Sequence, residues 1–264
     1  MVERERVSRG PRAYAAFIGI GLLAGILSGL FGVGGGTVIV PLLVLLLRFD
    51  QRLAAGTSLA AIVPTALVGV ISYAANGAVA WIPALILAAG SVVGAQIGTR
   101  MLARLSQTVL RWAFVGFLIV VIVTLFVVIP SRDAVFELSW VNGIALVGVG
   151  VVTGILAGLI GVGGGIVVVP IMMLAFGTSD LVAKGTSLLM MIPTALSGTY
   201  GNVRRGNVDL VAAALLGVAA CATTALGAWL ATVVDPFTGN VLFAVYLAVI
   251  AVQMALRAIR GRAR

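Results

Sequence analysis

The chain has 264 residues, of which 61% are hydrophobic and only 9% are charged, and its formal net charge is +9. Soluble globular domains carry about 25% charged residues, so this composition excludes a soluble protein and predicts a polytopic protein in a lipid bilayer. The basic excess does not indicate a nucleic-acid partner, because nearly all basic residues are arginines at the ends of apolar runs, where they set membrane topology.

Apolar runs follow one another along the whole chain. They fall at about 13–31, 37–47, 53–75, 81–103, 109–129, 138–160, 166–176, 182–203, 210–231 and 237–256. Most of them approach the roughly 20 residues that a membrane-spanning helix needs. The runs at 37–47 and 166–176 have only about 11 residues each, and each directly follows a glycine cluster. We therefore predict an all-α polytopic membrane protein with two half-length helices.

Two stretches of the chain are nearly identical. Residues 25–41 and 154–170 share 13 of 17 positions, including the run Gly-Val-Gly-Gly-Gly, and lie 129 residues apart. The sequence Gly-Thr-Ser-Leu that begins at Gly56 recurs at Gly185 with the same offset. A constant offset over such a span indicates that a unit of about 130 residues was duplicated.

Charge placement predicts how these units cross the membrane. If each glycine cluster is the turn of a hairpin whose two ends lie on one side, 15 of the 17 basic residues fall on a single side. Lys and Arg are in excess in cytoplasmic loops, so we predict the hairpin and place both termini in the cytoplasm.

Each repeat consists of one glycine-broken helical hairpin and three transmembrane helices. Its two ends therefore lie on opposite sides of the membrane. The first membrane repeat (1–132) and the second (133–264) are then inverted relative to each other and together form one transmembrane domain. Inverted-topology repeats are common in secondary transporters, where the substrate binds near the midplane at the repeat interface.

Three sets of glycines recur at every fourth position, a spacing that lets helix backbones approach closely in lipid. They are Gly21, Gly25 and Gly29; Gly90, Gly94 and Gly98; and Gly150, Gly154 and Gly158.

The glycine clusters are the first candidate for a binding site. Broken backbone in lipid must be buried in protein or line a cavity. The short runs begin just after the breaks, so their N-terminal N–H groups would face the centre and favour an anion. Alternatively, the glycines only permit tight, protein-packed turns. The predicted substrate-binding glycines are Gly32, Gly34, Gly35, Gly36, Gly161, Gly163, Gly164 and Gly165.

Hydroxyl side chains near the start of the next long run are the second candidate. Thr57 and Ser58 recur as Thr186 and Ser187. They can donate to an anion, or they can bond their own helix backbone or cap the helix start. Lys184 precedes the second pair, and a lysine near the end of a span usually extends to the interface. Gating or attraction of an anion is the alternative role for this lysine.

The residue types that the sequence lacks, or has only outside the apolar runs, argue against several classes of function. The chain has no histidine, and its eight acidic residues lie in tails or loops or at run edges. Proton relays and cation sites in membranes usually rely on buried Asp, Glu or His, which argues against a cation channel or a carboxylate-based proton coupler. We predict no metal site, no cofactor and no enzyme, since no base accompanies the possible nucleophiles. The glycine spacing fits neither a dinucleotide motif nor a P-loop.

At these residues the chain resembles the sulfite exporter TauE/SafE family of membrane permeases. The resemblance rests on Gly-Val-Gly-Gly-Gly followed by Val-Ile-Val-Pro41 or Val-Val-Val-Pro170, on Gly-Thr-Ser-Leu in each half, and on the halves themselves. It implies an inner-membrane transporter of small sulfur-containing anions such as sulfite, sulfoacetate or thiosulfate. The glycines and the hydroxyl pairs would line its central site.

Export by alternating access is the expected mode, because an inside-negative potential favours expelling an anion. Two alternatives stay open: an importer or channel for another small organic or inorganic anion, and a membrane protein that transports nothing, either an enzyme or a scaffold.

Overall fold

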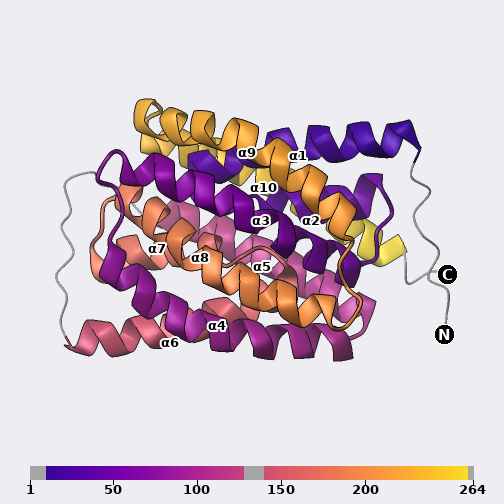
Figure 1. The fold of residues 1–264 in the computed structure, drawn as a ribbon, viewed down its shortest axis with the longest axis horizontal. Coiled ribbons are helices and arrows are strands. Elements are labelled where there is room, and N and C mark those ends of the chain that lie inside the picture. The colour runs from indigo at the N-terminus through magenta and orange to yellow at the C-terminus, as the bar shows by residue number, and fades with distance from the viewer. Residues whose placement is uncertain (1–9, 128–139, 261–264) are drawn as a thin grey trace.

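The computed structural model describes residues 10–127 and 140–260, and these form helices joined by short loops (Figure 1). In chain order the helices are α1 (Pro11–Phe31), α2 (Gly36–Leu46), α3 (Gln51–Ala74), α4 (Trp81–Arg104), α5 (Gln107–Val127), α6 (Trp140–Ile160), α7 (Gly165–Phe176), α8 (Asp180–Val203), α9 (Leu210–Val233) and α10 (Pro236–Arg260). The predicted order of helices is confirmed for the described residues. The predicted repeat boundary at 132/133 and the ends of two runs, at 128–129 and 138–139, lie outside them.

Seven of the described helices are long and apolar enough to cross a membrane. They are α1, α3, α4, α5 over Gln107–Thr124, α6, α8 and α9. Two others, α2 and α7, have 11 and 12 residues. At 1.5 Å per residue they extend about 17 Å, roughly half of the 30 Å hydrocarbon core. The protein is therefore an all-helical, multi-pass membrane protein that also contains two half-length helices.

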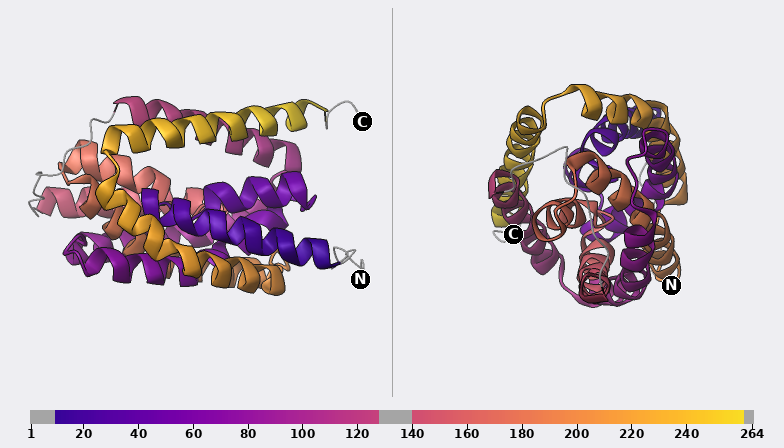
Figure 2. Two further views of the ribbon diagram at one scale, coloured as in Figure 1. Left: turned by 90° about the horizontal axis from the view of Figure 1, so that it is seen from above. Right: turned by 90° about the vertical axis from the view of Figure 1, so that its left-hand side faces the viewer.

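The helices lie side by side along the long axis of the molecule (Figure 1). Both α2 and α7 reverse direction after the glycine break: α2 ends where α1 begins, and α7 ends at the opposite end of the bundle, where α6 begins. Figure 2 shows α5 and α10 running together along one flank. The two short helices lie between this flank and the rest of the bundle, next to its centre.

Glycines fix how the two halves pack against each other. A Cβ built on Gly21 would lie 2.6 Å from the carbonyl oxygen of Leu216, and one built on Gly29 would overlap the carbonyl oxygen of Thr224. Successive glycines of α1 contact successive residues of α9 in the same chain direction. The two helices therefore run parallel, with their backbones in contact. This close approach confirms the role predicted for glycines at every fourth position.

The equivalent pair, α4 and α6, packs in the same way. A Cβ on Gly90 would overlap the backbone of Val147, and one on Gly98 would overlap that of Ile155. The first helix of each half therefore lies against the fourth helix of the other half.

At the centre, α3 and α8 run antiparallel with reciprocal contacts. A Cβ on Gly69 would lie 2.7 Å from a methyl of Leu188, and a Cβ on Gly198 would lie 2.9 Å from a methyl of Leu59. Each of these residues is 129 positions from its counterpart in the other half. The halves thus contact each other through matching residues, as two copies related by a pseudo-twofold axis do.

Side chains cap three of the long helices, α3, α8 and α9, whereas α1 and α4 have no side-chain cap. Asp50 accepts a hydrogen bond from the N–H of Leu53 at the start of α3, and Ser179 accepts one from Val182 at the start of α8. Such caps satisfy N–H groups that the helix itself leaves unpaired. Neither α2 nor α7 has a side-chain cap.

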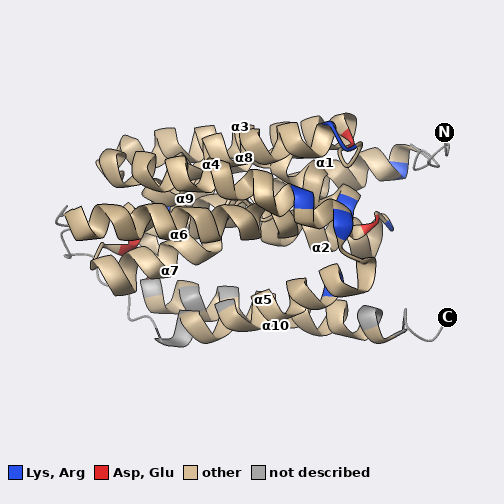
Figure 3. Cartoon of the chain, turned by 90° about the horizontal axis from the view of Figure 1, so that it is seen from below, with Lys and Arg blue, Asp and Glu red and all other residues tan. Residues whose placement is uncertain are grey.

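Basic residues gather at one end of the bundle, whereas acidic residues occur at both ends (Figure 3). The Lys and Arg positions visible in Figure 3 gather at the end where α1 begins. At this end the guanidinium of Arg52 donates to the carbonyl of Leu105 at 2.6 Å, and that of Arg205 donates to the hydroxyl of Thr99 at 3.3 Å. The predicted cytoplasmic arginines at positions 4, 6, 9, 262 and 264 lie outside the described residues.

Candidate functional site

The two glycine breaks have the same backbone conformation. Three glycines in each break have positive φ, a region that residues with a side chain rarely adopt. The φ values are 68° at Gly32, 71° at Gly34, 74° at Gly35, 82° at Gly161, 81° at Gly163 and 90° at Gly164. These residues are buried, and each break ends where α2 or α7 begins.

The two breaks touch each other. A Cβ built on Gly36 would lie 2.6 Å from the Cα of Val162, and one built on Gly165 would lie 2.6 Å from the carbonyl oxygen of Gly32. The short helices therefore begin next to each other in the interior. We refer to residues 32–36 and 161–165 as the first and second glycine turns.

One face of α8 covers the first glycine turn. The backbone and stem of Lys184 pack on Gly32, where a Cβ would lie 2.7 Å from the lysine Cα. The hydroxyl of Ser187 donates a hydrogen bond to the carbonyl of Gly32 at 2.8 Å. Met191 follows one turn later and reaches both turns, since a Cβ on Gly34 or Gly163 would overlap its Cε.

The equivalent face of α3 covers the second glycine turn. A Cβ on Gly161 would lie 2.7 Å from the Cβ of Ala55, and one on Gly163 would lie 3.2 Å from the Cδ1 of Ile62. Ser58 lies between these two residues on the same helix face, because residues three and four apart are neighbours on a helix. Its side chain is 0% exposed, and its hydroxyl has no hydrogen-bond partner among the described residues.

A buried hydroxyl without a partner is costly, about 1–3 kcal/mol. Ser58 therefore indicates a position where another polar group can bind. Thr37, in the first turn of α2, also has a buried hydroxyl without a partner within the part of the chain that the structure describes.

The electrostatics of this centre favour an anion. The first N–H groups of an α-helix have no partner within the helix, and its N-terminus carries a partial positive charge. Both short helices begin here, with left-handed glycines, Gly35 and Gly164, in place of a capping side chain. Two uncapped N-termini thus converge on one buried region. No group of acidic, histidine or cysteine side chains suited to a metal ion occurs in the described ranges.

The two threonines of the hydroxyl pairs contact loops of the opposite half. The hydroxyl of Thr57 accepts a hydrogen bond from the N–H of Asp209 at 3.0 Å, and that of Thr186 accepts one from the N–H of Ala80 at 3.0 Å. The structure therefore brings the predicted glycines together with the two serines. The threonine hydroxyls instead bind the loops that precede α9 and α4.

Lys184 forms an ion pair within its own helix. Its ammonium lies 3.2 Å from the Oδ2 of Asp180, and the two side chains are 12% and 2% exposed. Asp180 is the first residue of α8, where a carboxylate also benefits from the positive end of the helix. The charge of Lys184 is thus largely balanced beside the first glycine turn.

Sequence reasoning missed Ile62 and Met191. Both contact the glycine turns, and they are equivalent residues, 129 positions apart. The repeat offset and the spacing of four from Ser58 and Ser187 could have identified them. As apolar residues in apolar runs, they carried no chemical signal.

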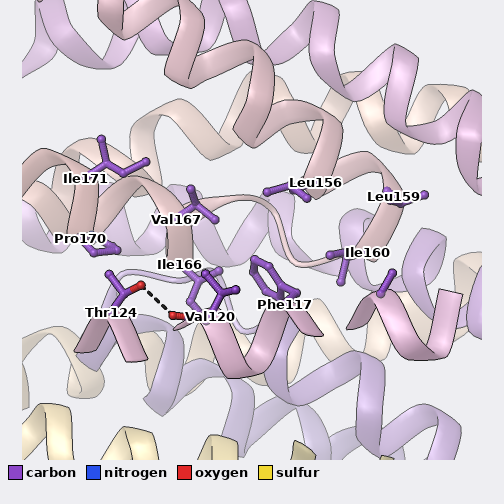
Figure 4. Close-up of a pocket in the computed structure, with 11 residues that line it drawn as sticks. Phe117, Val120, Thr124, Leu156, Leu159, Ile160, Ile166, Val167, Pro170 and Ile171 are labelled. Atoms are coloured by element: carbon purple, nitrogen blue, oxygen red, sulfur yellow. Dashed lines mark hydrogen bonds between the residues drawn. The ribbon is translucent and has the colours of Figure 1, made fainter. Parts of the chain in front are cut away.

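A separate cavity of about 380 Å³ lies between α5 and the pair α6 and α7 (Figure 4). Its lining is apolar apart from Thr124, whose hydroxyl donates to the carbonyl of Val120 at 2.7 Å. Ile160 and Ile166, on its wall, flank the second glycine turn. An ion would lose its hydration there without gaining partners, so the glycine turns remain the candidate anion site.

Comparison with known proteins agrees with this architecture. A family model described as "Sulfite exporter TauE/SafE" matches residues 2–125 and 146–264. "Probable membrane transporter protein YunE" of Bacillus subtilis is 30% identical over 220 residues, which cover 75% of this chain and 81% of that protein. A "Probable membrane transporter protein" of Haemophilus influenzae is 30% identical over 257 residues, or 90% of this chain and 96% of that protein.

A more distant relative comes from an archaeon. "Probable membrane transporter protein MJ0441" of Methanocaldococcus jannaschii is 28% identical over 167 residues, which cover 59% of this chain and 60% of that protein. No solved structure matches the chain. The family model covers both halves of the chain, and the chain therefore belongs to the sulfite exporter TauE/SafE family of multi-pass membrane transporters, which are not enzymes.

Proposed function

We propose that this protein is a secondary transporter that exports small sulfur-containing anions, such as sulfite, sulfoacetate or thiosulfate, across the inner membrane. One anion binds between the two glycine turns. The observation that carries this proposal is the contact between the turns, where two uncapped helix N-termini meet beside the buried, unpartnered hydroxyl of Ser58. The description of the matching family model supports the substrate class.

The chemistry of the centre suits an oxyanion. A charge buried in a membrane protein must be compensated by donors or opposite charge. In this account the N–H groups that begin α2 and α7 supply the donors, and Ser58 and Ser187 add hydroxyls. Thr57 and Thr186 position the loops that close over α3 and α8. Lys184 attracts the anion when its pair with Asp180 opens.

The two halves of the chain move relative to each other in the proposed cycle. Residues 1–132 and 133–264 form inverted repeats, and their relative rocking exposes the anion first to one side and then to the other. The arginine-rich end of the bundle faces the cytoplasm, as the positive-inside rule requires, and both termini lie on that side. An inside-negative potential then contributes roughly 2.3 kcal/mol per charge per 100 mV to export.

Counterflow in liposomes tests this function. Purified protein is reconstituted with unlabelled anion inside, and the uptake of labelled sulfite, sulfoacetate, thiosulfate and a simple carboxylate is measured. We expect exchange of at least one sulfur anion, faster than that of the carboxylate. An imposed potential should change net export. Absence of flux for every anion would refute transport, and exchange of the carboxylate alone would identify a carrier of another anion class.

Replacing Ser58 by alanine should weaken substrate binding without unfolding the protein. A hydrogen bond to a charged group contributes about 1.5–3 kcal/mol, which corresponds to a roughly ten- to hundredfold higher Kd. Removing an unpartnered hydroxyl should not destabilise the empty protein. Ser72→Ala is the matched control, because this serine is on the same helix and its hydroxyl bonds its own backbone at Val68. Equal affinities of the two variants for sulfite would argue against Ser58 as a ligand.

A further inference from the structure

The side chain of Met191 occupies the space between the two glycine turns. A Cβ built on Gly34 or Gly163 would overlap its Cε methyl, and one built on Gly165 would lie 2.8 Å from its Sδ. Met191 is 0% exposed. Its thioether therefore lies where an anion held by both turns would have to bind, and it must turn aside before the anion enters.

Ile62 is the counterpart of Met191 in the first half, and it touches the same glycines. Its Cγ2 would lie 3.2 Å from a Cβ on Gly34, and its Cδ1 would lie 3.2 Å from a Cβ on Gly163. Isoleucine is branched at Cβ and restricted at χ1. Methionine is unbranched, with three rotatable bonds, and adapts its shape at low cost. Of the two equivalent side chains, Met191 is the one that can turn aside.

Rotation of Met191 would also uncover the hydroxyl of Ser187, which lies 3.9 Å from its Sδ and donates to the carbonyl of Gly32. This hydroxyl can bind an oxyanion once its single proton turns from that carbonyl toward the anion.

We propose that Met191 is a specificity-determining residue of this transporter. Its methyl occupies the space between the two glycine turns. The volume released when this side chain rotates limits the size of the anion that can bind. This inference rests on the proposed function, because it requires an anion between the glycine turns. It assigns to one side chain the choice between a compact oxyanion such as sulfite and a longer one such as sulfoacetate.

Met190 provides a matched control for the role of Met191. It is the same residue type on the same helix and is also 0% exposed, but it is not among the atoms closest to the glycines of either turn. Truncating Met190 therefore measures the general cost of removing a buried methionine from α8.

The test compares Met191→Ala with Met190→Ala in proteoliposomes. The ratio of sulfoacetate to sulfite counterflow is measured, because a ratio is insensitive to the amount of folded protein. Met191→Ala removes Cγ, Sδ and Cε, and we expect it to raise this ratio at least tenfold, because a single methylene in an apolar pocket changes discrimination by roughly 10–200-fold. Met190→Ala should leave it at the wild-type value. The inference fails if Met191→Ala leaves the ratio unchanged or if both variants shift it equally.

A second measurement does not depend on flux. The seven methionines are labelled with ¹³C at the methyl group, and the signals of Met191 and Met190 are assigned from their leucine variants. Sodium sulfite or sulfoacetate should move the signal of Met191 and leave that of Met190 in place. An unmoved Met191 signal, at anion concentrations that saturate exchange, overturns the inference but leaves transport intact. If wild-type protein exchanges no anion and its Met191 signal does not move, the proposed function fails together with the inference.

Discussion

Replacing Gly36 by alanine should abolish anion transport. A Cβ at this position would lie 2.6 Å from the Cα of Val162 and 2.7 Å from the carbonyl oxygen of Gly161. Both neighbours are backbone atoms, which cannot rotate away as a side chain can. The two glycine turns must therefore separate, and the N-termini of α2 and α7 no longer converge on one anion. A displacement of about 1 Å in a site of fixed geometry can cost roughly a hundredfold in rate.

Gly19→Ala is the control for this experiment. Gly19 lies in α1, and a Cβ there meets no atom within 4 Å. Alanine favours a helix over glycine by about 1 kcal/mol, so this variant should be at least as stable as the wild type. Size-exclusion profiles and circular dichroism should show folded protein for both variants, with sulfite counterflow lost only in Gly36→Ala. Normal counterflow in Gly36→Ala would mean that the turns need not touch.

Replacing Gly94 by leucine, at the interface between α4 and α6, should lower the thermal stability of the protein. A Cβ on Gly94 would overlap the carbonyl oxygen of Val151, so Gly94→Leu should force the two backbones apart. Reciprocal contacts involve Gly154 against Ser91 along the same interface. In lipid, close backbone packing of small residues is a main source of helix association, and overpacking alone costs about 1–3 kcal/mol. We expect a lower thermal midpoint and a poor yield of folded protein.

Gly148→Leu separates this packing effect from the general cost of a leucine in the helix. Gly148 lies on the exposed side of α6, and a Cβ there meets no atom within 4 Å. Thermal stability is read by size-exclusion chromatography after heating in detergent. The interface account predicts a lower midpoint for Gly94→Leu and an unchanged one for Gly148→Leu. Equal midpoints would contradict the tight packing of α4 on α6.

Much of this architecture could be predicted because it depends on local sequence. Run length and hydropathy identified the helices and the half-length pair α2 and α7, and the spacing of Gly90, Gly94 and Gly98 identified a helix interface. The repeat offset placed the glycine clusters in equivalent positions. These signals need no knowledge of which helix packs against which.

The interior of the candidate site could not be predicted in the same way. Whether the hydroxyl of Thr57 forms a hydrogen bond with a substrate or with the loop at Asp209 depends on how the two halves of the chain pack against each other. The same holds for Met191, whose methyl reaches both glycine turns because α8 packs against them. Such contacts join residues far apart in the sequence, and an apolar side chain in an apolar run gives no sign of them.

The central claim is that an anion binds between the two glycine turns. The most direct test is a crystal structure of the protein soaked with selenite, a heavy analogue of sulfite, once selenite has been shown to compete with sulfite in counterflow. We predict one anomalous peak, from selenium, between Gly34 and Gly163, with a selenite oxygen about 2.5–3.0 Å from the hydroxyl oxygen of Ser58 and the Met191 methyl displaced. A peak elsewhere in the protein, with Met191 still between the turns, would contradict the claim.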